Sequence, residues 1–241
     1  MILLRSLVYF FAMVVSVVVY GLAIVLPGWF LPVAYTDTLA QRWGRVNLWL
    51  QRVICGLDVN VVGMENLPRT GPFILMSKHQ SAWETIALRG LVRADQSWVL
   101  KYELTRIPIF GWGLRLAQAI PIDRAAGRRA VKFLIEQGVD RLQKGRCVIV
   151  FPEGTRTAPG ERRKYGLGGA MLAERSGVPV VPVAHNAGVF WRRRGVKKYP
   201  GTIQLVVGPP IASAGKKAAV IMTEVEDWIE TRQAGFPSQP G

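Results

Sequence analysis

Apolar and polar positions along the chain form three successive patterns. An uncharged, almost wholly apolar run covers residues 7–26, and large apolar residues then recur every three or four positions up to residue 57. Beyond that point, short apolar runs typical of buried strands alternate with segments of helical spacing. This alternation predicts an α/β fold with a mixed β-sheet sandwiched by helices. The expected strands are residues 58–62, 73–76, 98–100, 119–122, 147–151, 178–183 and 203–207, and the expected helices are 81–91, 128–142 and 216–231.

The apolar run at residues 7–26 is long enough to cross a membrane. No charged side chain occurs from Ser6 to Thr36, and twenty helical residues rise about 30 Å, the thickness of a bilayer's hydrocarbon core. A secretory signal peptide is the competing interpretation, but its apolar region usually has about 7 to 15 residues, and no clear cleavage site follows. We therefore expect a retained membrane anchor. Pro27 and Pro32 leave open whether it spans the bilayer or returns.

The segment after the anchor has the pattern of a basic amphipathic helix, which Asp37 would cap. Its stripe of large apolar residues either lies in the membrane interface, which the neighbouring anchor favours, or packs on the protein core. Arg42, Arg45 and Arg52 outnumber the single Arg5 before the anchor. By the positive-inside tendency, this places the domain that follows on the cytoplasmic side of an inner membrane.

The net charge of +15 requires a partner of opposite sign. Nucleic acid is one candidate, and an anionic membrane surface or a phosphorylated substrate is another. The anchor favours the membrane, and the basic clusters at 162–164, 192–198 and 216–217 show no nucleic-acid module and no interleaved aromatic residues. We therefore expect no nucleic-acid partner. Two cysteines, Cys55 and Cys147, give no disulfide framework, which suits a reducing compartment.

The stretch from Phe73 to Glu84 joins an apolar strand to reactive side chains. Ser81 followed three positions later by Glu84 has the form of a capping box, so His79 falls in the turn between strand and helix. A histidine there, one turn from a carboxylate, is a candidate base with its orienting partner. These residues are equally compatible with a simple helix cap beside a polar loop. We expect no metal, because His-x4-Glu is not a histidine pair and no cysteine cluster adds ligands.

Two further strand ends show the same pattern of an apolar run, a turn and charged residues. One carries Asp123 and Arg124, and the other carries Glu153 and Arg156. In α/β folds such loops commonly meet at one edge of the sheet.

Residues from about 60 to 210 resemble the glycerolipid acyltransferases, most closely the 1-acylglycerol-3-phosphate acyltransferases. Four motifs of that family occur in order. They are His-x4-Asp/Glu at 79–84, Pro-Ile-Asp-Arg at 121–124, Phe-Pro-Glu-Gly-Thr-Arg at 151–156 and Val-Pro-Val-Val-Pro-Val at 178–183.

The resemblance implies that His79 takes a proton from the hydroxyl of a lysophospholipid as that oxygen attacks an acyl thioester. The donor is acyl-CoA or an acyl carrier protein, and no cofactor is expected. Glu84 would hold the imidazole in the right tautomer. Backbone N–H groups near Ser81 would stabilise the developing oxyanion.

The same resemblance implies a phosphate clamp made by Arg156 and Arg124, with Lys101 as a third candidate. Glu153, Gly154 and Thr155 complete the expected substrate-binding set; among them, Glu153 would orient the loop and Gly154 would let the backbone turn. His185 is expected to be structural. Two departures from the family pattern concern Glu84, which stands where Asp is commoner, and Tyr165-Gly166, where a lysine usually accompanies the aromatic residue; Lys164 is a possible replacement.

The expected organisation is a membrane anchor at residues 1–57, a catalytic domain at 58–234 and a flexible tail at 235–241. The expected reaction forms phosphatidic acid from 1-acyl-glycerol-3-phosphate. Alternative acceptors are another lysophospholipid, an ornithine lipid or a lipid A type precursor. The last is disfavoured by the proline-rich and arginine blocks.

Overall fold

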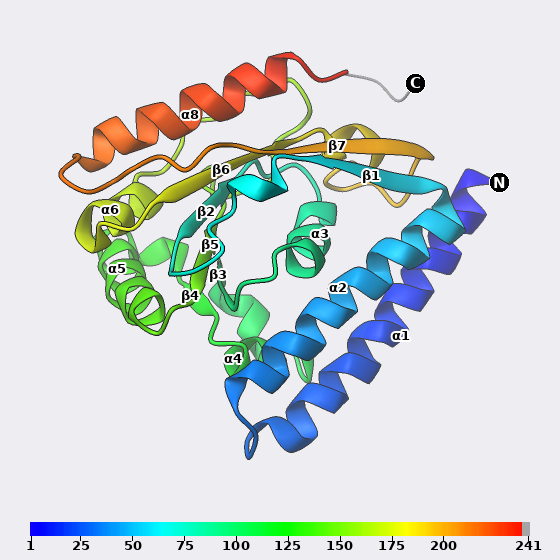
Figure 1. Cartoon of the computed structure of the whole chain (residues 1–241). Helices are drawn as coiled ribbons and strands as arrows, with labels where there is room; N and C mark the ends of the chain where they lie inside the picture. The colour runs from blue at the N-terminus through cyan, green and yellow to red at the C-terminus, as the bar shows by residue number, and fades with distance from the viewer. Residues whose placement is uncertain (238–241) are drawn as a thin grey trace.

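The computed structural model describes residues 1–237, and a mixed sheet of seven strands forms its centre (Figure 1). The strand order is β1-β7-β6-β2-β5-β3-β4, and all neighbouring strands are parallel except the antiparallel pair β6 and β7. The strands are β1 (Leu57–Val62), β2 (Ile74–Ser77), β3 (Gln96–Lys101), β4 (Ile120–Ile122), β5 (Cys147–Val150), β6 (Val180–His185) and β7 (Gly201–Val207). The mixed α/β sandwich expected from the sequence is confirmed.

Helices cover both faces of the sheet. The α-helices are α1 (Ile2–Gly28), α2 (Val33–Cys55), α3 (Trp83–Leu91), α4 (Phe110–Leu116), α5 (Arg128–Gln143), α6 (Gly168–Ser176), α7 (Ala187–Phe190) and α8 (Ala218–Ala234). The 3-10 helices are η1 (Met64–Asn66), η2 (Tyr102–Arg106) and η3 (Arg124–Ala126). The sequence pattern did not predict α4, α6 or α7, because α4 and α6 are short and rich in glycine and α7 is a single turn.

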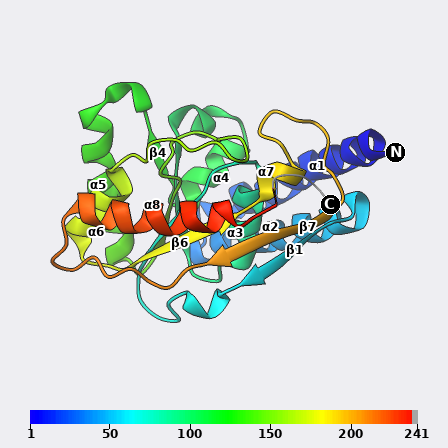
Figure 2. The same ribbon diagram turned by 90° about the horizontal axis from the view of Figure 1, so that it is seen from above.

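Two hydrophobic cores result, one on each face of the sheet. Along β2 and the residue before it, Phe73 and Leu75 face the core under α3 and the N-terminal helices. Ile74 and Met76 face the core under α5, α6 and α8. Side chains alternate along a strand, so a strand buried on both faces reads as a continuous apolar run. Figure 2 shows α8 over the sheet, with α1 and α2 on its far side.

The N-terminal helices α1 and α2 form an antiparallel hairpin against the domain (Figure 1). α1 is long and apolar enough to cross a membrane, and many of its large apolar side chains are exposed, which indicates membrane association. Yet both ends of α1 contact the domain. Near its start, Tyr9 packs edge-on against Trp191 at 5.8 Å between ring centroids, and the Ser6 hydroxyl accepts the Lys198 backbone N–H at 2.9 Å.

α2 differs from the helix expected from the sequence in two ways. It begins at Val33, so Asp37 lies inside it rather than at its cap. Its most buried residues include polar ones, Asp37, Asn47 and Gln51, whereas Trp49 and Val53 are exposed. The polar side chains therefore face the protein and part of the apolar stripe faces outward. The division of the chain at residue 57 stays a prediction, and residues 238–241 of the expected tail lie outside the described residues.

α2 and α3 cross at very close range because two glycines meet. A Cβ built on Gly44 would lie 2.5 Å from the backbone nitrogen of Gly90. No other residue type fits at this crossing without moving a helix. The contact fixes α3, the helix that follows the His79 turn, against the N-terminal hairpin.

The sheet topology determines where the loops meet. Strands β2, β5, β3 and β4 are parallel neighbours, so their carboxyl ends share one edge. His79, Glu153 and Arg124 follow three of these ends, and Lys101 closes the fourth strand. Parallel sheets place ligand sites at this edge.

Candidate active site

His79 and Glu84 form a hydrogen-bonded pair in the turn between β2 and α3. The His79 Nδ1 lies 2.7 Å from Glu84 Oε1, and Glu84 is fully buried while the His79 side chain is 13% exposed. Phe151 stacks on the imidazole with ring centroids 4.2 Å apart. The ring is therefore held on one face and at one nitrogen.

This geometry determines the protonation of the pair. A carboxylate only accepts hydrogen bonds, so Nδ1 carries the proton and Nε2 keeps a free lone pair. Burial opposes ionisation of Glu84, but His185, His79 and the Ser81 N–H outweigh it, so the pKa of the Glu84 carboxyl is below its usual range. The result is a histidine poised to accept a proton at Nε2.

Glu84 also performs the capping role considered as the alternative interpretation. Its carboxylate accepts the backbone N–H groups of Gln80 and Ser81 at 2.8 Å each. The helix cap and the histidine partner are thus the same side chain. One expectation is wrong for these two groups: because Gln80 and Ser81 already donate to Glu84, their N–H groups are not available to an oxyanion.

The loop after β5 holds the backbone of His79 from both sides. The His79 N–H donates to Glu153 Oε2 at 2.6 Å, and the His79 carbonyl accepts the Thr157 N–H at 2.8 Å. Thr157 also donates its hydroxyl to Glu153 at 3.0 Å. The sequence pattern singled out the Phe-Pro-Glu-Gly-Thr-Arg block for substrate contact. The structure shows that part of the block positions the histidine.

A buried ion pair lies directly behind His79. The Lys78 ammonium is 2.8 Å from Glu153 Oε1 and 2.8 Å from Glu230 Oε1 of α8, and Tyr165 donates its hydroxyl to Glu230 at 2.7 Å. Burial raises the pKa of the Glu153 carboxyl, while the Lys78 ammonium and the hydrogen bond from the His79 N–H oppose that rise. The strand end before His79 is thereby tied to the C-terminal helix.

A second contact from α8 holds the residue after His79. The Gln80 side-chain amide donates to Gln233 at 2.9 Å, and Gln233 donates to the His185 carbonyl at 2.9 Å. No sequence pattern marked Glu230 or Gln233, because they lie about 150 residues from the motif they support.

His185 is structural, as its sequence position suggested. It is fully buried, its Nε2 donates to the Lys78 carbonyl at 2.9 Å, and its Nδ1 accepts the Ala187 N–H at 3.2 Å. Both nitrogens are thus used by the neutral ring. Burial lowers the pKa of His185, in agreement with that neutral form.

A cavity of about 490 Å³ opens in front of His79. It brings together five of the eight residues predicted to form the site, namely His79, Lys101, Arg124, Gly154 and Arg156. Gly154 has a φ of 69°, the left-handed conformation in which glycine is favoured.

The three remaining predicted residues do not line this cavity. Glu84 and Glu153 lie behind His79, where their contacts are described above. For Glu84 this is the position expected of the residue that holds the imidazole. Glu153 was expected in the substrate-binding set, but its sequence signal, a charge within a motif, does not distinguish a group that faces the substrate from one that supports the base. Thr155 also lies off the cavity wall, so its predicted substrate contact has no support from the geometry.

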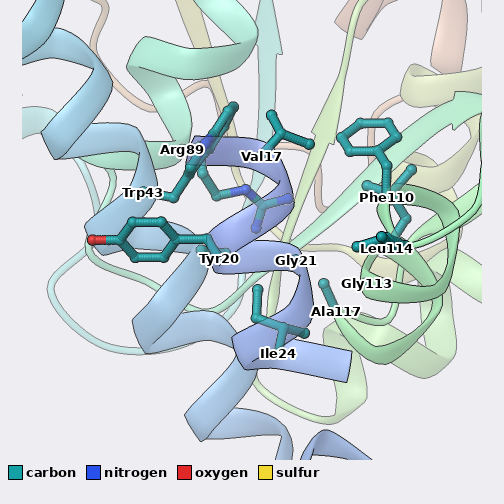
Figure 3. A pocket seen from close by; sticks show the side chains of 12 residues that line it. Val17, Tyr20, Gly21, Ile24, Trp43, Arg89, Phe110, Gly113, Leu114 and Ala117 are labelled. Carbon is teal, nitrogen blue, oxygen red and sulfur yellow. The ribbon is translucent and has the colours of Figure 1, made fainter. Parts of the chain in front are cut away.

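A second, smaller cavity of about 90 Å³ adjoins the first (Figure 3). The two cavities share Trp43, Arg89, Phe110 and Leu114 in their walls. The smaller one lies among α1, α2, α3 and α4, and its remaining lining comes from Val17, Tyr20, Gly21, Ile24, Ala40, Ile109, Gly113 and Ala117. The space in front of His79 thus continues into an apolar recess beneath the N-terminal hairpin.

Comparison with known proteins agrees with this architecture. The family model described as Acyltransferase matches residues 58–186. The chain is 44% identical over 199 residues to the 1-acyl-sn-glycerol-3-phosphate acyltransferase of Pseudomonas aeruginosa, covering 81% of this chain and 77% of that protein. It is 30% identical over 195 residues to a chloroplast 1-acyl-sn-glycerol-3-phosphate acyltransferase of Arabidopsis thaliana, covering 79% of this chain and 52% of that longer protein.

The crystal structure of the 1-acyl-sn-glycerophosphate acyltransferase PlsC from Thermotoga maritima superimposes with a TM-score of 0.78 at 25% identity, over 98% of both chains. An α/β sheet with a histidine and carboxylate pair at its carboxyl edge, beside an apolar recess, defines an acyltransferase class of site. The chain belongs to the acyltransferase family.

Proposed function

We propose that this enzyme transfers an acyl chain from a thioester to the free hydroxyl of 1-acyl-sn-glycerol-3-phosphate, which gives phosphatidic acid. The observation that carries the proposal is the His79–Glu84 pair facing a cavity that also holds Lys101, Arg124 and Arg156. A base and an anion-binding group in one cavity suit an acceptor that has both a hydroxyl and a phosphate. The names of the relatives point to the same acceptor.

The proton transfer follows from the tautomer. His79 Nε2 takes the proton of the acceptor hydroxyl as that oxygen attacks the thioester carbonyl, and the imidazolium is stabilised by Glu84. Collapse of the tetrahedral intermediate breaks the carbon–sulfur bond, and the imidazolium returns the proton to the thiolate. The attack is direct, so no acyl-enzyme forms.

The acceptor's phosphate would be bound at the mouth of the cavity. Arg156 is half-buried, whereas Arg124 and Lys101 are exposed, so the three cations form a gradient from the cavity toward solvent. Guanidinium groups bind phosphate oxygens in pairs. The apolar recess beneath α1 and α2 suits an acyl chain, which would be shielded from water there.

The membrane supplies the lipid substrate. The exposed apolar face of α1 would lie in the bilayer, and the basic surface would face anionic headgroups. We place the protein at the inner membrane with its catalytic side in the cytoplasm, where acyl-CoA or an acyl carrier protein serves as donor.

The test is an acceptor panel in which product lipids are identified by mass spectrometry. The parent protein should acylate 1-acyl-sn-glycerol-3-phosphate, and His79→Ala should lose about 10² to 10⁴ in rate. Arg156→Ala should raise the KM for this acceptor by roughly tenfold to a hundredfold without changing that of the donor. Arg163→Ala, an exposed arginine of the basic cluster, is the matched control.

Two outcomes would contradict the proposal. Equal activity on a lysolipid without a phosphate would show that the acceptor is misassigned. A donor KM that rises while the acceptor KM stays constant would move Arg156 to the phosphates of CoA.

A further inference from the structure

Arg89 is a buried arginine whose guanidinium carries an unsatisfied hydrogen-bond donor in the part of the chain that the structure describes. It projects from α3, its exposed fraction is 7%, and its Nη1 finds no acceptor among residues 1–237. The guanidinium lies over the ring of Trp98, whose centroid is 4.9 Å from Cζ. Buried arginines are normally paired with an acceptor, so a charged group left in this state requires an explanation.

The carboxylate of Asp37, which acts electrostatically on Arg89, is already occupied. Asp37 binds Arg146 through two hydrogen bonds, at 2.7 and 2.9 Å. The three groups Asp37, Arg146 and Arg89 therefore carry a net positive charge in the interior. Burial lowers the pKa of Arg89 to about 10, so it remains charged at neutral pH. Its donors are available to a ligand.

The place of Arg89 in the cavities indicates which ligand. It lies in the wall shared by the His79 cavity and the smaller recess, and among the described residues it alone carries a charge in the lining of the recess. In Figure 3 its side chain reaches from α3 toward α1, amid apolar and aromatic neighbours. A ligand group that reaches Arg89 from within the recess is therefore surrounded by apolar lining and belongs to a ligand that is otherwise apolar there.

We propose that Arg89 forms a binding site for an oxygen atom carried partway along the acyl chain, so that the enzyme accepts acyl thioesters with a hydroxyl or keto group at that depth. The inference rests on the proposed function, because it assumes that the acyl chain of the donor enters the recess. The oxygen accepts a hydrogen bond from the guanidinium, and no covalent step is involved.

Chain selection follows from desolvation. An unsubstituted chain that fills the recess removes water from Arg89 and offers no acceptor in return. A hydroxyl at the depth of Arg89 restores one hydrogen bond to the charge. A hydroxyl at another depth meets only apolar lining and is itself left unpaired. Selectivity between chains should therefore depend on the position of the oxygen, and not on polarity alone.

The experiment compares palmitoyl-CoA with hydroxypalmitoyl-CoA isomers that carry the hydroxyl at an early, a middle or the terminal carbon. The acceptor is 1-acyl-sn-glycerol-3-phosphate, and acyl carrier protein thioesters replace CoA if the parent requires them. For the parent, we expect kcat/KM to fall by about tenfold to a hundredfold at most positions and to be retained or raised at one position.

The variant Arg89→Met should abolish the positional preference. The isomer favoured by the parent should lose about tenfold to a hundredfold relative to palmitoyl-CoA, and palmitoyl-CoA itself should be used as well or better. The ratio is measured within each variant, so a lower yield of folded protein does not affect it. If Arg89→Met does not fold, Arg89→Lys is the second variant, because it keeps the positive charge beside Asp37. It should retain part of the positional preference.

Arg93→Met is the matched control, because Arg93 is exposed just beyond α3. It should leave every ratio unchanged. The inference is overturned if all isomers are penalised equally in the parent, or if a positional preference survives in Arg89→Met. Both outcomes leave the proposed function intact, whereas absence of any transfer from both palmitoyl-CoA and palmitoyl-acyl carrier protein in the parent would count against the function itself.

Discussion

The two ends of β5 each carry a buried ion pair, yet only one pair touches the reactive histidine. At the amino end, Arg146 binds Asp37 of α2, with side chains 3% and 1% exposed. Beyond the carboxyl end, Glu153 binds Lys78, with side chains 0% and 2% exposed. By burial the two pairs are equivalent. Burial of a charged pair therefore does not identify a functional site. The functional pair is recognised by the catalytic group that it holds in place.

The pairs differ in what surrounds them. Glu153 also binds the His79 N–H, and Lys78 also binds Glu230, so that pair joins the histidine turn to α8. Arg146 instead donates to Ser97 and to the Gln96 carbonyl, which closes the amino edge of the sheet onto the N-terminal hairpin. We expect the first pair to affect catalysis and stability, and the second to affect stability alone.

The largest effect is expected for Lys78→Met. Removal of the ammonium leaves Glu153 buried and Glu230 partly buried without a cation, which should destabilise the fold by about 3 to 5 kcal/mol. The His79 backbone loses its fixed support, and misplacement of a catalytic group by about 1 Å costs roughly 10²-fold in kcat. Thermal unfolding measures the loss of stability, and initial rates on folded protein measure the loss of kcat. Lys132→Met, in an exposed pair with Glu136, is the control and should change neither. Full activity of Lys78→Met would remove the distinction between the two pairs.

The next effect is expected at the amino end of β5. Asp37→Asn should cost about 3 kcal/mol or more in stability, because Arg146 stays buried with a neutral partner. The kcat per folded molecule, measured with palmitoyl-CoA, should stay near that of the parent. If kcat instead falls as far as in Lys78→Met, the pair at the amino end also affects catalysis, which contradicts the expected difference between the two pairs.

The smallest effect concerns acid stability near His79. The pKa of Glu84 is lowered in the folded protein, so its carboxylate contributes stability that is complete above the unfolded value of about 4.3. That contribution is lost as the pH falls through the lower folded value. Denaturant titrations of the parent and Glu84→Gln should give a constant difference in unfolding free energy above about pH 5, which narrows on further acidification. A difference that grows in acid would reverse the sign of the assigned shift.

The sequence predicted the fold and the carboxyl edge of the sheet well, for a physical reason. Strand runs end abruptly at charged residues, and parallel neighbours bring such ends together, so His79, Arg124 and Arg156 were expected in one place. Periodicity cannot tell a buried charge from an exposed one. Asp37 therefore looked like a helix cap, and Lys78 was not assigned a role.

The contacts that distant parts of the chain make with the site could also not be predicted from the sequence. Glu230 and Gln233 occur in an ordinary helical pattern, and only the packing of α8 on the sheet places them beside the motif. Arg89 reads as a polar position of α3. Only the three-dimensional structure shows that its Nη1 has no acceptor among residues 1–237 and that it lies in the wall of both cavities.

The glycine crossing of α2 and α3 has a practical consequence for engineering a water-soluble form. Removing residues 1–57, which form both N-terminal helices, would expose Gly90 and remove Asp37 from Arg146, and a generic anchor fused in their place would not restore either contact. A better route keeps both N-terminal helices and recodes only the outward side chains of α1, such as Leu4, Phe11 and Val19, to polar residues. The protein would then gain solubility in water while the contacts of α2 with the catalytic domain are retained.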